Sequence, residues 1–293
     1  MSFELDKTPM SLIHPFFELY QRLNPNADSK IYSQLTIDLI RHYKDEAKYP
    51  QSPLQFLMDQ WQESLDIGEP DYSVYGSPYY MVEGYACWAI YSRTVLRNIR
   101  KRKTEIFGDD VSKILDIGNG IGLSTVNLRE LFPDAQIFAN NFEGSEQWKI
   151  NEVLQKDANY TLLNEHLDGN ERVDLIFASE YFEHIIDPIE HARELIQMFD
   201  PKYMIIANSF NTLGIGHFRS YYNGGQMVDQ SKISRLFNKY LRDSGYELVK
   251  PPFFNNTPAV WRRKNDPRLL DIPDCLRFQK DLFEKSVGNQ SLN

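Results

Sequence analysis

The chain has 293 residues, of which 42% are hydrophobic and 25% are charged, and its formal net charge is -9. This composition is that of a globular protein large enough for one domain with an added cap. It argues against duplex nucleic acid as a partner, because such proteins usually carry a basic face, while two cysteines are too few for a disulfide framework or a zinc cluster.

The first 105 residues are predicted to be mostly helical. Apolar residues recur at helical spacing over residues 12–20 and 35–40, and a turn-rich link over 68–78 precedes a longer helix expected from about 79 to 103. This helix ends in a basic run, Arg97 to Lys103, whose cations would face the negative end of the helix dipole. Binding of a phosphate group is the alternative role of this run. We expect residues 1–105 to form a helical cap that contributes to a substrate site.

Strands and helices are expected to alternate over residues 106–265, and residues 266–293 are expected to form a C-terminal tail. Strands are predicted at 113–117, 136–139, 160–163, 173–178, 203–207, 246–249 and 259–263, and helices at 123–132, 147–154, 188–199 and 231–244. This alternation predicts an α/β fold with a doubly wound, mostly parallel seven-stranded sheet. Ligands bind such sheets beyond the carboxyl ends of the strands. Residues 214–217 and 221–225 are expected to form a flexible loop at the mouth of that pocket.

A glycine-rich turn follows the first of these strands, with the sequence DIGNGIG over residues 116–122. Gly118, Gly120 and Gly122 tolerate positive φ and let the backbone approach a ligand, and the helix that follows offers free N–H groups. The third glycine comes one residue too early for the dinucleotide fingerprint G-x-G-x-x-G. No G-K-[ST] sequence is present either, which excludes a P-loop.

The D-x-G-x-G-x-G turn resembles motif I of the class I methyltransferases that use S-adenosylmethionine. Residues 173–188, with Glu183-His184 and Asp187-Pro188, look like the fourth-strand region of small-molecule members, and the resemblance spans about residues 110–265. It implies an antiparallel last strand and S-adenosylmethionine as the cofactor. The residues that it implies for cofactor binding are Asp116, Gly118, Asn119, Gly120, Gly122, Asn141, Phe142, Ser179 and Glu180.

The sequence departs from this family at the end of the second strand. Members usually place there an Asp or Glu that accepts hydrogen bonds from both ribose hydroxyls, whereas this chain has Asn141. A neutral amide accepts without charge assistance, which costs on the order of 1 kcal/mol, and Glu143 is an alternative acceptor. The departure leaves open a catalytically inactive methyltransferase-fold binding module.

Residues after the fourth strand are the candidates for catalysis. Methyl transfer is an in-line displacement that depends largely on positioning, and some members add a general base. Tyr181, Glu183 and His184 are the candidate catalytic residues, and His184 is favoured as the base because an imidazole titrates near neutrality. A structural role at the start of the next helix is the alternative for His184. Glu180 and Asn208 alone offer too few ligands for a metal site, so none is predicted.

The acceptor is expected to be bound by residues from three places in the chain. Tyr75, Tyr79 and Tyr80 flank a Gly-Ser-Pro turn, and tyrosine rings can line a pocket or contact a sulfonium. Asn208 follows the fifth strand, and His217 follows a glycine-containing segment.

These features together predict methyl transfer from S-adenosylmethionine to a small-molecule acceptor. The chain has neither a D/N-P-P-Y/F/W sequence after the fourth strand nor a Pro-Cys pair, so both common nucleic-acid chemistries are disfavoured. A nucleotide- or nucleic-acid-modifying methyltransferase remains the alternative, with the basic run as its contact surface. We expect no membrane partner and a cytoplasmic location, because no apolar span or signal peptide is visible. The oligomeric state is left open.

Overall fold

A seven-stranded sheet forms the centre of the protein. The computed structural model describes residues 3–26, 53–108, 110–164, 172–249 and 259–264, and all structural statements below concern these residues. The strands are β1 (Lys113–Asp116), β2 (Gln136–Asn140), β3 (Thr161–Leu163), β4 (Leu175–Ser179), β5 (Tyr203–Ala207), β8 (Tyr246–Val249) and β9 (Ala259–Arg263). They lie in the order β3-β2-β1-β4-β5-β9-β8, and all pairs up to β4–β5 are parallel. β9 runs antiparallel to both of its neighbours, as expected for the last strand.

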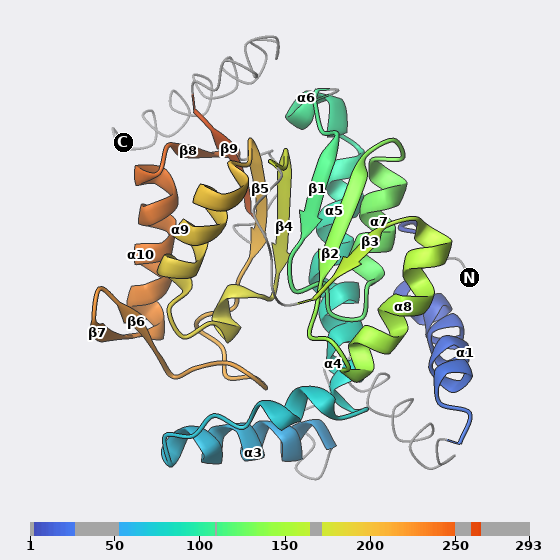
Figure 1. Ribbon diagram of the computed structural model, residues 1–293, viewed down its shortest axis with the longest axis horizontal. Coiled ribbons are helices and arrows are strands. Elements are labelled where there is room, and N and C mark those ends of the chain that lie inside the picture. Colours follow the sequence, from blue (N-terminus) through green and yellow to red (C-terminus); the bar gives the residue numbers. More distant parts are fainter. Residues whose placement is uncertain (1–2, 27–52, 109, 165–171, 250–258, 265–293) are drawn as a thin grey trace, which may run out of the picture.

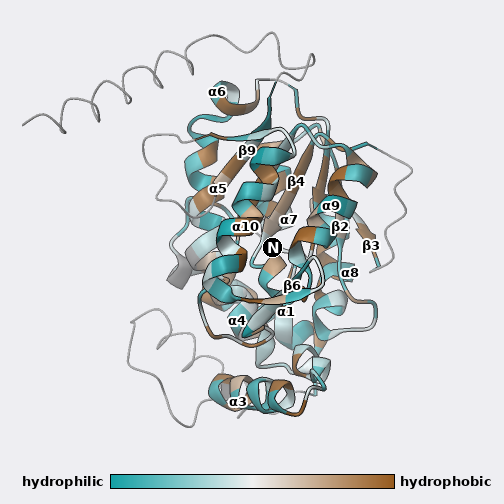
Figure 2. Ribbon diagram, turned by 90° about the vertical axis from the view of Figure 1, so that its left-hand side faces the viewer, coloured by the Kyte–Doolittle hydropathy of each residue, from teal (hydrophilic) through white to brown (hydrophobic). Residues whose placement is uncertain are grey.

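Successive residues of the central strands point into two different hydrophobic cores. Ile114 belongs to one core and Leu115 to the other, and Phe177 and Ile176 divide in the same way. This follows from the period of two in a strand, where neighbouring side chains face opposite sides of the sheet. Strands buried on both faces are continuous apolar runs, and Figure 2 shows the strands as largely hydrophobic.

Helices cover both faces of the sheet (Figure 1). The first core is shared by α1 (Ile13–Leu23), α5 (Arg93–Arg100), α7 (Leu123–Leu131) and α8 (Glu146–Ala158). The second core is shared by α3 (Pro53–Asp66), α9 (Pro188–Phe199) and α10 (Gln230–Asp243). The expected doubly wound α/β fold is therefore confirmed. Within the described ranges, none of the helices is long and apolar enough to cross a membrane.

The helix expected over residues 79–103 is present in several parts. It begins as α4 (Tyr80–Cys87), widens into a π-helical turn (Trp88–Ser92), continues as α5 and is followed by the short α6 (Lys103–Phe107). Two 3₁₀ turns, Pro9–Leu12 and Tyr72–Gly76, precede it. The helical pattern at 35–40 and the tail at 266–293 lie outside the described residues.

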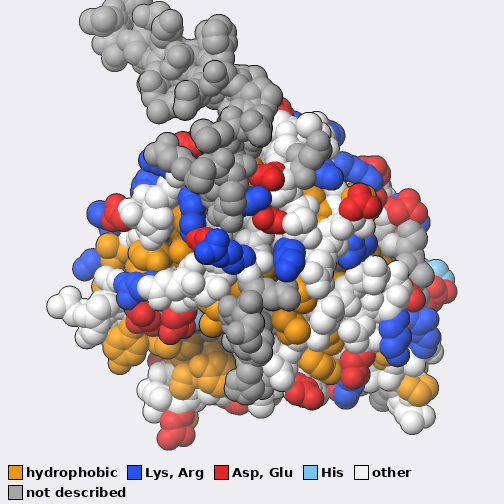
Figure 3. Space-filling model, turned by 45° about the horizontal axis from the view of Figure 1, so that its top comes forward, with side chains coloured by type: hydrophobic (Ala, Val, Ile, Leu, Met, Phe, Trp, Pro, Cys, Tyr) orange, Lys and Arg blue, Asp and Glu red, His pale blue; other side chains and the backbone are white. Residues whose placement is uncertain are grey.

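The basic run at the end of α5 is engaged in ion pairs. Arg100 contacts Asp6 at 2.9 Å and Glu130 at 2.6 Å, and Arg102 pairs with Glu105. This end of α5 lies beside α6 and the amino end of β1 (Figure 1). In Figure 3, basic and acidic side chains are interspersed over the described part of the visible face. These contacts favour the capping role over phosphate binding.

The prediction of a loop over residues 221–225 is wrong. This segment belongs to a hairpin of β6 (Ser220–Asn223) and β7 (Gln226–Asp229), joined at Gly224 and Gly225, which both have positive φ. Tyr221 is fully buried, and its hydroxyl donates to the backbone oxygen of Glu183 at 3.0 Å. The hairpin thus packs against the turn that carries Glu183.

Candidate active site

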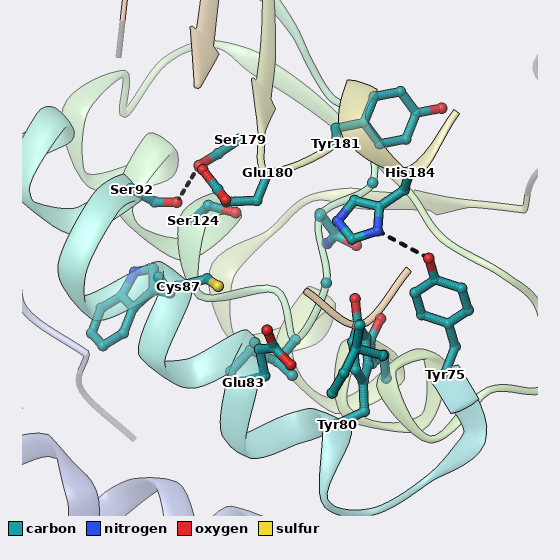
Figure 4. Close-up of a pocket in the computed structure, with 18 of the residues that line it drawn as sticks. Tyr75, Tyr80, Glu83, Cys87, Ser92, Ser124, Ser179, Glu180, Tyr181 and His184 are labelled. Carbon is teal, nitrogen blue, oxygen red and sulfur yellow. Dashed lines mark hydrogen bonds between the residues drawn. The ribbon is translucent and has the colours of Figure 1, made fainter. Parts of the chain in front are cut away.

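A cavity of about 320 Å³ opens at the carboxyl ends of the parallel strands. Figure 4 shows α4 as one wall, with Tyr80, Glu83 and Cys87 directed inward, and the ends of the strands as the other. The predicted site residues that line it are Tyr75, Tyr80, Asp116, Gly118, Asn119, Gly120, Asn141, Phe142, Ser179, Glu180, Tyr181, His184 and His217. The predicted residues outside the lining are Tyr79, Gly122, Glu183 and Asn208.

The turn between β1 and α7 requires its three glycines for different reasons. Gly118, Gly120 and Gly122 have φ values of +60°, +54° and +82°. A Cβ at Gly118 would lie 2.2 Å from the ring of Tyr181, and one at Gly122 would lie 2.5 Å from Oδ1 of Asn151. Nothing lies within 4 Å of a Cβ at Gly120. Gly120 therefore presents bare backbone to open space in the cavity.

A network of asparagine amides fixes the shape of this turn. Asn140 Oδ1 accepts from the backbone N–H of Gly118 at 2.7 Å. The backbone oxygen of Gly120 accepts from Nδ2 of Asn141 at 2.7 Å and from Nδ2 of Asn151 at 2.8 Å. Sequence reasoning missed Asn140 and Asn151, because these contacts join residues that are 22 and 31 positions from the turn.

Asn141 already has hydrogen-bond partners within the chain. Besides its bond to Gly120, its Oδ1 accepts from the N–H of Phe142 at 2.9 Å. A carbonyl oxygen has a second lone pair, so the predicted contact with a ribose hydroxyl stays a prediction. Glu143, the alternative acceptor, is exposed and is not among the described residues that line the cavity.

Asp116 ends β1 and is buried against the first turn of α7. Its carboxylate accepts from Ser124 Oγ at 2.9 Å and from Thr125 Oγ1 at 2.6 Å. Burial raises the pKa of Asp116 to about 7, although both hydroxyl donors oppose this shift. The side chain thus joins the strand to the helix below the glycine turn.

Three glutamates from two distant parts of the chain gather at this end of the sheet. Burial raises the pKa of Glu83 to about 7, and the charge of Glu180 adds to the shift. Burial also raises the pKa of Glu180 and, more strongly, that of Glu183, which the charge of Glu180 reinforces. No Lys or Arg occurs among the described residues that line the cavity. Glu83 lies in α4, where the sequence offered no pattern that marked it.

Hydrogen bonds from one residue hold two of these carboxyl groups. Ser209 Oγ donates to Glu180 Oε2 at 2.5 Å, and the N–H of Ser209 donates to Glu183 Oε1 at 2.8 Å. Glu183 Oε2 is buried without a hydrogen-bond partner. Glu180 adopts a positive φ of 53°, a conformation that is uncommon for non-glycine residues.

His184 points into the cavity and is held by Tyr75 (Figure 4). Its Nδ1 lies 3.0 Å from the Tyr75 hydroxyl, and its ring meets that of His217 edge to face, with centroids 4.9 Å apart. Burial lowers the pKa of both imidazoles, and the neighbouring His217 lowers that of His184 further. Both rings are therefore neutral near pH 7.

The fold around this cavity can now be assigned from the strand order. β9 lies antiparallel between β5 and β8, and the glycine turn after β1 opens onto the cavity. The chain has the class I methyltransferase fold. No family model and no curated protein matches the sequence.

Solved structures with a similar arrangement of elements have low sequence identity to this chain. A candidate O-methyltransferase of Nostoc punctiforme is 16% identical, with a TM-score of 0.49 over 78% of this chain and 72% of that one. Human N-acetylserotonin methyltransferase in complex with S-adenosylmethionine is 14% identical, with a TM-score of 0.46 over 71% and 66%. A fibrillarin pre-rRNA processing protein of Methanococcus jannaschii is 16% identical, with a TM-score of 0.39 over 57% and 76%. Likenesses of this size carry neither a substrate nor an activity over to this chain.

The three predicted catalytic residues lie differently with respect to the cavity. The ring of Tyr181 packs against Gly118, and its hydroxyl lies 2.9 Å from His191 Nε2, directed away from the cavity (Figure 4). Glu183 is fully buried behind the lining. The side chain of His184 points into the cavity.

Proposed function

We propose that this protein is an enzyme that transfers the methyl group of S-adenosylmethionine to a small-molecule acceptor in the cavity. The observation that carries the proposal is Gly120, whose backbone faces open space while the glycines on either side are packed against side chains. Free N–H groups at a helix start and a backbone without side chains suit a bulky adenosyl ligand. The adenosyl group would lie along the glycine turn, between Asp116 and Phe142.

The acceptor would lie on the other side of the cavity, against Tyr75, Tyr80 and His184. In the reaction the acceptor atom forms a bond to the methyl carbon as the carbon–sulfur bond breaks, and the sulfonium becomes a neutral thioether. Positioning of the two molecules supplies much of the rate. A cavity of about 320 Å³ with no cationic lining side chain among the described residues favours a small acceptor over a polyanion.

The test is to replace Gly120 by valine and to measure S-adenosylmethionine binding by calorimetry. A β-branched residue at φ +54° fills the space that the ligand needs, so the dissociation constant should rise at least ~10-fold, or ~1.4 kcal/mol. Gly108→Val is the matched control, because Gly108 has φ +58° and equally open surroundings at the opposite end of β1. Both variants place a β-branched residue at a positive φ, but only Gly120→Val should lose binding. Unchanged binding in Gly120→Val would refute the proposal.

A further inference from the structure

Three potential metal ligands meet at the edge of the cavity. Glu183 and His184 end the 3₁₀ turn Phe182–His184 after β4, and His217 comes from the loop after β5. One nitrogen or oxygen from each lies within 4.8 Å of the others. The sequence prediction of no metal site considered only Glu180 and Asn208, because nothing in the sequence brought the two histidines together.

The two imidazoles are prepared to act as ligands. His217 Nδ1 faces the carbonyl oxygen of Thr212 at 2.9 Å. A carbonyl only accepts, so this Nδ1 carries the proton and Nε2 of the neutral ring keeps a free lone pair. His184 is also anchored through Nδ1, which lies 3.0 Å from the Tyr75 hydroxyl; a hydroxyl can donate or accept, and in both cases Nδ1 is engaged and Nε2 is the ring nitrogen left for a ligand role. Metal-binding histidines are usually oriented by such a bond at the second ring nitrogen.

Gly216 keeps this arrangement closely packed. A Cβ at this position would lie 2.0 Å from the Tyr75 hydroxyl and 2.4 Å from His184 Nδ1. Only glycine, here with φ +82°, fits between the loop and the two side chains. The loop that carries His217 is thereby seated against His184.

The carboxyl groups beside the histidines lack a counter-charge. Glu183 Oε2 is buried and accepts from no N–H or hydroxyl group, and the neighbouring group is the carboxyl of Glu180, with which Glu183 shares a side-chain hydrogen bond. In the part of the chain that the structure describes, no Lys or Arg forms an ion pair with Glu180 or Glu183. Buried carboxylates are normally paired or coordinate a metal ion.

We propose that Glu183, His184 and His217 bind one divalent transition-metal cation, such as Mn²⁺, Co²⁺ or Zn²⁺. Two imidazoles with a carboxylate suit these ions better than Mg²⁺ or Ca²⁺, which prefer oxygen ligands alone. Both histidines line the cavity, which gives the cation a path of entry and an open position toward the acceptor.

The metal site rests on the proposed function and would specify the chemical class of the acceptor. A cation at this point would bind a hydroxyl group of the acceptor and make its proton easier to remove. The O–H proton would pass to the carboxylate of Glu180, the oxygen would form the bond to the methyl carbon, and the carbon–sulfur bond would break. The methylated atom is then a hydroxyl oxygen, and His184 holds the cation.

The experiment is a titration of the metal-free full chain with Co²⁺, followed by visible absorption. We expect one Co²⁺ per chain, with binding weakened at least ~10-fold in His184→Ala and in His217→Ala. Tyr75→Phe keeps the ring and removes the hydroxyl that orients His184, so it should weaken binding ~10-fold while remaining folded. His14→Ala is the control, because His14 lies beside Glu18 on the exposed face of α1 and should bind Co²⁺ as the wild type does.

Two results would overturn the metal site. One is the absence of stoichiometric Co²⁺ binding by the wild type, and the other is wild-type affinity in His217→Ala and Tyr75→Phe, whose fold is checked by circular dichroism. Calorimetry with S-adenosylmethionine on the metal-free chain separates the two proposals. Cofactor binding without any Co²⁺ binding would leave the proposed function standing and remove the metal site.

Discussion

Asp116 shows how a single buried carboxyl group connects the fold to the pH dependence of stability. It is 1% exposed, and its partners are two hydroxyl groups without positive charge. Burial therefore outweighs both hydrogen bonds and raises its pKa from 3.8 to about 7. Between pH 3.8 and about 7, the folded state therefore keeps a proton on Asp116 that the unfolded chain has mostly lost.

At the scale of the residue, we predict that the free energy of unfolding falls as the pH rises from 3.8 to about 7. The difference between 3.8 and about 7 corresponds to ~4 kcal/mol in all, of which ~2 kcal/mol should appear between pH 5 and 7.5. Asp116→Asn cannot ionise, so its free energy of unfolding in urea should fall by ~2 kcal/mol less over that range. Asp134→Asn, at an exposed turn, serves as the control and should follow the wild type. Parallel curves for Asp116→Asn and the wild type would contradict the assignment.

At the scale of elements, the Asp187-Pro188 pair explains how α9 begins. Asp187 Oδ1 accepts from the backbone N–H of Glu190 at 3.2 Å, and Pro188 occupies the first helical position. Proline suits that position because its missing N–H would have had no partner within the helix. Within the segment that resembles the methyltransferases, Asp187-Pro188 therefore forms the start of α9, which packs against the second core.

The element-scale prediction concerns this helix start. Asp187→Ala should lower the free energy of unfolding by ~1 kcal/mol, because a side-chain cap of the first turn is lost. Asp187→Asn should restore most of the stability, since an amide oxygen also caps well. Chemical denaturation measures both, and S-adenosylmethionine affinity should not change in either variant. A loss of affinity in Asp187→Ala with unchanged stability would place Asp187 in the site instead.

The elements also show which parts of the sequence were readable. The glycine turn, β4 and α9 were predicted because each rests on a local pattern within a few residues. The hairpin of β6 and β7 was missed, although Asn223-Gly224-Gly225 directly after Tyr221 and Tyr222 is a hairpin signal. The π-helical turn at Trp88–Ser92 leaves no pattern in the amino-acid types and could not be predicted.

At the scale of the whole molecule, the two ends of the sheet have opposite electrostatic character. At the carboxyl end, the buried carboxyl groups of Glu83, Glu180 and Glu183 form no ion pair with a Lys or Arg of the described residues, and none lines the cavity there. At the amino end, Asp174 accepts from the N–H groups of Ser112 and Lys113 and pairs with Lys202 at 3.1 Å. Burial opposes the charge of Asp174, but these donors outweigh it and hold its pKa below the usual range.

The whole-molecule prediction is that the amino end loses stability in acid. The contribution of Asp174 is present above the pKa of an unfolded aspartate and is lost as the pH falls through its lower folded-state value. Asp174→Asn should cost ~1–3 kcal/mol at pH 7, and its deficit against the wild type should shrink below pH ~4. Urea unfolding at several pH values measures this. Asp243→Asn, which removes an exposed i,i+4 pair with Lys239, should change stability by less than ~0.5 kcal/mol at every pH.

The site as a whole was only half accessible to sequence reasoning. The glycine turn occupies one short stretch, residues 116–122, and was predicted. The opposite wall of the cavity combines Glu83 with Glu180 and His184 with His217, and these contacts depend on how α4 and the loop after β5 fold over the sheet. The spacing of residues along the sequence does not indicate such tertiary contacts.

The π-helical turn at Trp88–Ser92 separates α4, part of which lines the cavity, from α5. Before it, Tyr80, Glu83 and Cys87 face the cavity; after it, Val95 and Ile99 are buried in the first core. A π turn accommodates one extra residue and so resets which side of a helix faces inward. Substitutions at Tyr80, Glu83 and Cys87 would therefore change the cavity wall while Met81, Tyr85, Val95 and Ile99 keep the helix packed in the first core, which makes this helix a natural place to engineer selectivity.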